Sequence, residues 1–98
     1  MPVREREIES YLRKRVEEHG GVCEKFIPDL DSGMPDRIVM LPGGVLVWVE
    51  TKKPKGGKVS PIQLYQHGRL RKLGQAVEVG WTKVQADEFI ARYAAPRT

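Results

Sequence analysis

The chain has 98 residues, of which 40% are hydrophobic and 31% charged, and its net charge of +4 gives a pI near 9.4. This size and composition indicate one domain over residues 1–98 and exclude a disordered or fibrous protein. The chain has no apolar run of the roughly 20 residues that span a bilayer, no secretory signal pattern and only one cysteine, Cys23. We therefore expect a protein of the reducing cytoplasm without membrane contact, and its basic charge favours an anionic partner, nucleic acid first.

The first half of the sequence predicts one helix followed by three strands. Apolar residues at helical spacing, Ile8 and Leu12 among them, predict a helix that ends at two glycines. A proline and two glycines between two apolar runs are a strong hairpin signal. The predicted elements are a helix over 5–18 and strands over 22–27, 37–41 and 45–52.

The second half predicts a helix, a strand and a last helix. Residues 60–63 (SPIQ) combine an N-cap, a proline at the first helical position and the glutamine of a capping box. The helix they open should end near Leu73, and a strand over 75–81 follows. A second capping box at 82–85 opens a helix that reaches Tyr93. The predicted order is α-β-β-β-α-β-α, an α/β fold with a mixed sheet flanked by helices.

The predicted hairpin gathers three charged side chains at one end of the sheet. A three-residue loop pairs Leu41 with Val45, and the same register places Asp36 across from Glu50. Opposed residues share a face with Cβ atoms about 4.5–5.5 Å apart, and Lys52, two positions further, points the same way. Two close carboxylates suit a hard divalent cation, Mg²⁺ above all, and a nearby lysine assists phosphodiester hydrolysis.

The spacing of Glu50 and Lys52 says little without this placement. With 13 acids and 8 lysines in the chain, about one acid-x-Lys triplet arises by chance, and an exposed ion pair at a strand end explains the triplet equally well. The position opposite Asp36, before a basic loop and a capped helix, is what favours a site.

With these residues the chain resembles the PD-(D/E)xK nuclease superfamily, whose motif here reads Pro35-Asp36 followed by Glu50-Thr51-Lys52. The stretches "SGMPDRIVMLPGGVLVWVETKKPKGGKVSPIQ" and "RLRKLG" look more closely like the virus-type replication-repair nuclease (VRR-NUC) family, in its short phage-associated form. The resemblance covers residues 5–90. It implies the restriction-endonuclease-like fold and a Mg²⁺-dependent DNA endonuclease.

The resemblance also implies roles for single residues. Asp36 and Glu50 are expected to bind Mg²⁺, for which Mn²⁺ substitutes, and the backbone carbonyl of Thr51 adds a ligand. Lys52 is expected to assist the attacking water. Gln63 matches a family glutamine that orients water or DNA, although the capping box also accounts for it.

The family pattern further includes a glutamate on the first helix. Glu9 is the first candidate, because Glu9-x-x-Leu12 running to His19-Gly20 looks like the opening of archaeal Holliday-junction resolvases. Glu5 lies on the same helical stripe and is the second candidate.

The expected partner is DNA, held in part by Lys53, Lys55 and Lys58 of the basic loop. The likeness to junction resolvases implies branched DNA, and two sites for two strands favour a C2 homodimer. A DNA-binding module without catalysis and an RNA-directed nuclease are the alternatives.

Five other side chains carry expectations without a catalytic role. His67, like His19, lacks a partner at zinc-ligand spacing and is expected at the surface. Cys23 is expected in the core. Trp48 should pack under a helix on the Glu50 face, and Trp81 should pack in the core or an interface.

Overall fold

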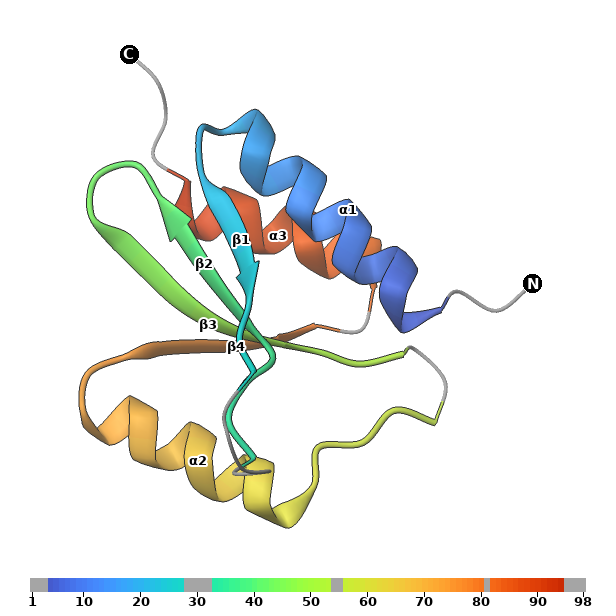
Figure 1. Ribbon diagram of the computed structural model, residues 1–98, viewed down its shortest axis with the longest axis vertical. Helices are drawn as coiled ribbons and strands as arrows, with labels where there is room; N and C mark the ends of the chain where they lie inside the picture. Colours follow the sequence, from blue (N-terminus) through green and yellow to red (C-terminus); the bar gives the residue numbers. More distant parts are fainter. Residues whose placement is uncertain (1–3, 28–32, 54–55, 81, 95–98) are drawn as a thin grey trace.

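The computed structural model describes residues 4–27, 33–53, 56–80 and 82–94 and contains the predicted order of elements. The two expectations placed on Lys55 and Trp81 lie outside the described residues. Figure 1 shows the elements in chain order. They are α1 (Glu5–Glu18), β1 (Val22–Lys25), β2 (Arg37–Leu41), β3 (Val45–Thr51), α2 (Pro61–Lys72), β4 (Ala76–Gly80) and α3 (Lys83–Tyr93).

The four strands form one mixed sheet in the order β1-β2-β3-β4. β1, β2 and β3 run antiparallel, and β4 joins β3 in parallel after the crossover through α2. Leu41 pairs with Val45, so the predicted hairpin register is confirmed. Gly43 and Gly44 both have positive φ, 90° and 78°, which a two-glycine turn allows at no steric cost.

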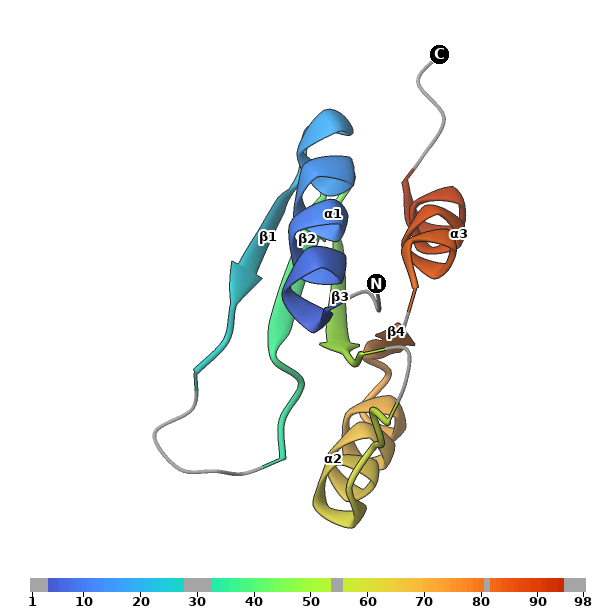
Figure 2. The same ribbon diagram turned by 90° about the vertical axis from the view of Figure 1, so that its right-hand side faces the viewer.

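The helices lie on both faces of the sheet (Figures 1 and 2). α1 and α3 pack together over one face, and α2 lies on the other side, alongside β4. The core fills the α1–α3 side, because alternate strand residues such as Val39, Val47 and Val49 meet Leu12 and Phe89 there. Each of these five side chains is at most 4% exposed. This core fixes the end of β3 relative to the first turns of α1.

Both predicted capping boxes are present. Ser60 caps α2 by accepting a hydrogen bond from the Gln63 N–H, and the Gln63 side chain accepts one from the Ser60 N–H. Thr82 and Gln85 make the same exchange at α3. Predicted boundaries differ from the observed ones at strand ends, where the first strand stops at Lys25 rather than residue 27. Among the described helices none is long and apolar enough to cross a membrane.

Three side chains outside the predicted site test the sequence expectations. Cys23 is buried as expected, and Trp48 is half-buried with its ring edge-on to Phe26 at a centroid distance of 5.3 Å. The surface position predicted for His67 is wrong. Its side chain is buried because His67 lies on the inner face of α2 together with Leu70, three residues further along the helix.

Candidate active site

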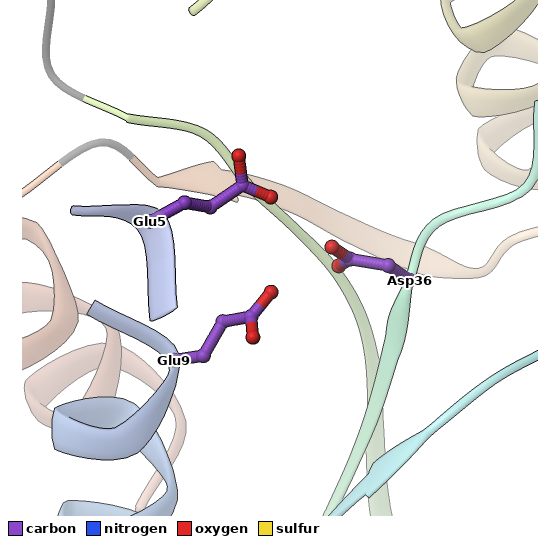
Figure 3. Close-up of side chains that lie close together, drawn as sticks. All are labelled: Glu5, Glu9 and Asp36. Carbon is purple, nitrogen blue, oxygen red and sulfur yellow. The ribbon is translucent and has the colours of Figure 1, made fainter. Parts of the chain in front are cut away.

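Three carboxylates converge where α1 begins and β2 starts. Oxygen atoms of Glu5, Glu9 and Asp36 lie within 4.8 Å of one another, and all three side chains are half-buried. Figure 3 shows the carboxylates pointing toward one another, two from α1 and one from the segment that leads into β2. Glu5 and Glu9 stand one helical turn apart and share a face. Both glutamates weighed from the sequence therefore reach Asp36.

Thr51 and Arg37 hold this carboxylate cluster in place. The Thr51 hydroxyl lies 2.9 Å from Glu9 Oε1 and 3.2 Å from Asp36 Oδ2, and the Thr51 N–H donates to Asp36 Oδ1 at 3.3 Å. Arg37 Nη2 donates to Glu9 Oε2 at 2.8 Å. Donors to a carboxylate favour its charged form, so these contacts stabilise two anions that would otherwise repel each other.

Asp36 is nevertheless under electrostatic stress. Burial raises the pKa of its carboxyl above the ordinary value, and the charge of Glu9 raises it further. The Thr51 hydrogen bonds act in the opposite direction, but the net shift is upward. A cation between these oxygen atoms would reverse the balance, since an opposite charge close by favours the ionised carboxylate.

Glu50 lies on the other face of the sheet from Thr51, because successive strand residues point to opposite sides. It is 3% exposed, and its Oε1 faces His67 Nε2 of α2 at 3.5 Å. Burial, and next the charge of Asp36, raise the pKa of Glu50 to about 7, and the Lys52 charge acts against this shift. The charge of Asp36 thus acts on Glu50, although Glu50 is not part of the cluster of Glu5, Glu9 and Asp36.

The predicted set of three charged groups differs in one detail from the observed arrangement. The register is as predicted, but the Asp36 side chain bonds to Thr51 and clusters with the helical glutamates, while Glu50 turns toward α2. Like charges and the Thr51 donors account for this separation. The carboxylates thus lie on both sides of the end of β3, with Glu5, Glu9 and Asp36 on one side and Glu50 on the other.

The remaining candidate residues surround this strand end. The Lys52 N–H donates to the carbonyl of Gly80 at 2.8 Å and so extends the pairing with β4. The positive charge of Lys52 lowers the pKa of both Glu50 and His67. Gln63 is half-buried at the start of α2, with its side-chain oxygen used by the capping box.

The basic loop after β3 is described at Lys53 and Lys58, both exposed. Gly57 approaches Lys53 so closely that a Cβ at this glycine would lie 2.4 Å from the Lys53 carbonyl oxygen. A larger residue at 57 would therefore push the loop away from the strand end.

Sequence reasoning missed Arg37, the Thr51 side chain and His67. For two of them a signal was present in the sequence. Thr51 continues the buried alternation of Val47 and Val49, and His67 lies four residues after Gln63 and three before Leu70 on one helical face. The partner of Arg37 lies 28 residues away on α1, which no local pattern reveals.

Comparison with known proteins places this arrangement in a family. No family model matches the sequence. A protein of Acyrthosiphon pisum secondary endosymbiont phage 1, named "Putative nuclease p44", is 44% identical over 77 residues, which are 79% of this chain and 82% of p44. A solved structure described as a VRR_NUC domain superposes with a TM-score of 0.84 and 39% identity, covering 91% of this chain and 96% of the other. The chain therefore belongs to the VRR-NUC family of nucleases.

Proposed function

We propose that this chain is a Mg²⁺-dependent DNA endonuclease that hydrolyses phosphodiester bonds. The observation that carries the proposal is the convergence of Glu5, Glu9 and Asp36 within 4.8 Å, beside the buried Glu50, in a chain of the VRR-NUC family. Oxygen donors of this kind suit Mg²⁺, and Mn²⁺ substitutes with the same ligands.

The residues present fit such a cation. Asp36 and Glu50 would bind it, with Glu9 or Glu5 and the Thr51 carbonyl completing the protein ligands. Glu50 is buried, and its Oε1 has no hydrogen-bond partner among the described residues. A cation bound to this carboxylate would offset the cost of burying its charge. A bound Mg²⁺ supplies Lewis-acid polarisation of the phosphate and a more acidic water.

Lys52 and Gln63 act on the reacting groups in this proposal. The positive charge of Lys52 acts on Glu50, and it would stabilise the negative charge that develops on the phosphate. Gln63 orients water or DNA through its amide N–H₂ group, which stays free to donate while the oxygen serves the capping box.

The exposed lysines of the basic loop are proposed to contact DNA phosphates. Lys53 and Lys58 would do so from their described positions, with Lys55 as a further candidate. Each phosphate contact adds to the salt dependence of binding. Lys53→Ala together with Lys58→Ala should weaken DNA affinity and flatten its dependence on salt, measured by fluorescence anisotropy with Ca²⁺ replacing Mg²⁺. Affinity that does not change with salt would contradict this assignment.

The sheet supports the proposed homodimer. Val22, Met40 and Leu46 are paired in register across three strands, and they are 42%, 41% and 40% exposed on the face away from α1 and α3. A continuous apolar row of this kind suits a second copy related by a two-fold axis. Met40→Glu should convert a dimer into a folded monomer in analytical ultracentrifugation, and a wild-type monomer would refute the dimer.

The substrate proposed is branched DNA. The proposed location is the cytoplasm of the host cell, because a chain with a single cysteine suits a reducing compartment. A four-way junction, a linear duplex of the same sequence and a matched RNA are incubated with the protein in Mg²⁺. Preferential cleavage of the junction supports the proposal, whereas equal cleavage of junction and duplex removes the branched-DNA part. Preferential cleavage of the RNA identifies an RNA-directed nuclease instead.

Lys52→Ala separates a nuclease from a DNA-binding module of the same fold. The variant should bind the junction as the wild type does and lose cleavage. A wild-type protein that binds DNA but cleaves none of the substrates would refute the endonuclease.

A further inference from the structure

Glu50 and His67 form a buried contact. The proposed function gives Glu50 a role but gives His67 none. His67 Nε2 lies 3.5 Å from Glu50 Oε1, and the two side chains are 2% and 4% exposed. Neither atom has a hydrogen-bond partner among the described residues. A buried polar atom without a partner costs about 1–3 kcal/mol. An apolar residue would avoid that cost at this position of α2.

The contact is close to a hydrogen bond. An N–H···O bond has its heavy atoms about 2.7–3.2 Å apart, so a shift of a few tenths of an ångström completes it. A neutral imidazole carries one N–H, and Nε2 is the ring atom that faces Glu50. No described residue donates a hydrogen bond to Glu50 Oε1 in the present geometry, so this oxygen is open to the His67 N–H.

The imidazole is well fixed to do this. Pro61 and the Ser60 capping box set the start of α2, and His67 shares its inner face with the buried Leu70. The ring thus reaches Glu50 from a capped helix rather than from a loop. A side chain fixed by a packed helix orients its partner more firmly than a side chain on an exposed segment does.

We propose that His67 is a positioning residue of the metal site: its Nε2–H holds Glu50 Oε1, so that the second oxygen of Glu50 is directed to a cation shared with Asp36. This inference rests on the proposed function. Hydrogen bonds of this kind from outside the ligand set fix the orientation of a ligating carboxylate, and their loss costs about 10- to 100-fold in metal affinity or activity.

Two substitutions of His67 separate the effect of its N–H donor from the effect of its side-chain volume. His67→Leu fills the space without an N–H, whereas His67→Gln offers an amide N–H at a similar reach. Mn²⁺ binding to full-length protein without DNA is measured by electron paramagnetic resonance, and thermal unfolding is followed in EDTA. We expect His67→Leu to weaken Mn²⁺ binding about 10- to 100-fold without lowering the unfolding temperature, and His67→Gln to retain most of the affinity.

His19→Leu is the matched control, because the chain has two histidines and His19 Nδ1 contacts the Arg15 carbonyl at 2.9 Å, at the far end of α1. It should leave Mn²⁺ binding unchanged. Wild-type affinity in His67→Leu, or equal losses in His67→Leu and His67→Gln, would overturn the positioning role.

A measurement on the wild type keeps the inference testable if the variants unfold. In ¹H–¹⁵N spectra of the imidazole rings, Mg²⁺ should shift the Nε2 resonance of His67 and leave that of His19 in place. An unmoved His67 resonance in a protein that binds Mg²⁺ and cleaves DNA overturns this inference alone. A wild type that neither binds Mg²⁺ nor cleaves DNA overturns the proposed function and the inference together.

Discussion

The carboxylates on the two sides of β3 differ in their hydrogen-bond partners. On the α1 side, Asp36 and Glu9 accept hydrogen bonds from Thr51, and Glu9 also pairs with Arg37. On the α2 side, Glu50 is more deeply buried, and its Oε1 has no hydrogen-bond partner among the described residues.

This difference teaches how a site can be both stable and reactive. The hydrogen bonds on the α1 side offset part of the cost of burying these carboxylates and hold their geometry. A buried carboxylate without a partner does cost folding energy, and a cation that binds it releases that cost. The α1 side would therefore fix where the proposed cation lies, and Glu50 would strengthen its binding.

The largest effect on cleavage should come from neutralising a carboxylate on either side of β3. Asp36→Asn and Glu50→Gln each take one negative ligand from the proposed cation, so each should lower the single-turnover cleavage rate in Mg²⁺ by about a thousandfold, or roughly 4 kcal/mol. Glu24→Gln on β1 removes an exposed carboxylate and serves as the control. If only one of the two site variants loses activity, the cation is held from one side of the strand.

Without metal, Asp36→Asn and Glu50→Gln should differ in how their free energy of unfolding changes with pH. Because the pKa of Glu50 is raised to about 7 in the folded protein, the folded state holds this proton more tightly than the unfolded state. The resulting stability is complete below the unfolded pKa near 4.5 and is lost as the pH rises through about 7. In EDTA the wild type should therefore lose roughly 2–3 kcal/mol relative to Glu50→Gln between pH 5 and pH 8.

Urea unfolding at the two pH values measures this loss. Asp36→Asn should show a smaller difference from the wild type, since the Thr51 hydrogen bonds oppose the upward shift of the Asp36 pKa. If the free energies of unfolding of the wild type and Glu50→Gln change with pH in parallel, the charge of Glu50 at neutral pH does not destabilise the folded protein.

The sequence predicted the sheet end well because the hairpin register is a local property. One turn of known length pairs Leu41 with Val45, and every later pair follows. The capping boxes at Ser60 and Thr82 are equally local and were predicted with their glutamines.

The direction of each side chain was harder to predict, because it depends on contacts between distant segments. Thr51 meets Glu9 across 42 residues, and Arg37 meets Glu9 across 28. Histidine occurs at surfaces and in interiors alike, so composition alone did not indicate the burial of His67. Its position on the helical face of Leu70 did, but only once α2 was known to cover Glu50.

Thr51→Val tests the support on the α1 side with a smaller expected effect. The substitution keeps the branched shape and removes the hydroxyl that lies beside Glu9 and Asp36, so we expect Mn²⁺ affinity to fall about tenfold. Thr51→Ser restores the hydroxyl and should recover most of the affinity in calorimetric titration. Equal losses in the two variants would show that the methyl packing of Thr51 matters and that its hydroxyl does not.

The smallest effect should distinguish the two glutamates of α1. Glu9 is fixed by Thr51 and Arg37, whereas Glu5 lies in the first turn of α1, where the positive end of the helix already favours its charge. A fixed ligand loses less conformational entropy on binding, so Glu9→Gln should weaken Mn²⁺ binding more than Glu5→Gln does. Calorimetric titration of both variants at one pH ranks them. The reverse order would make Glu5 the helical ligand, with Glu9 serving to hold Arg37 and Thr51 in place.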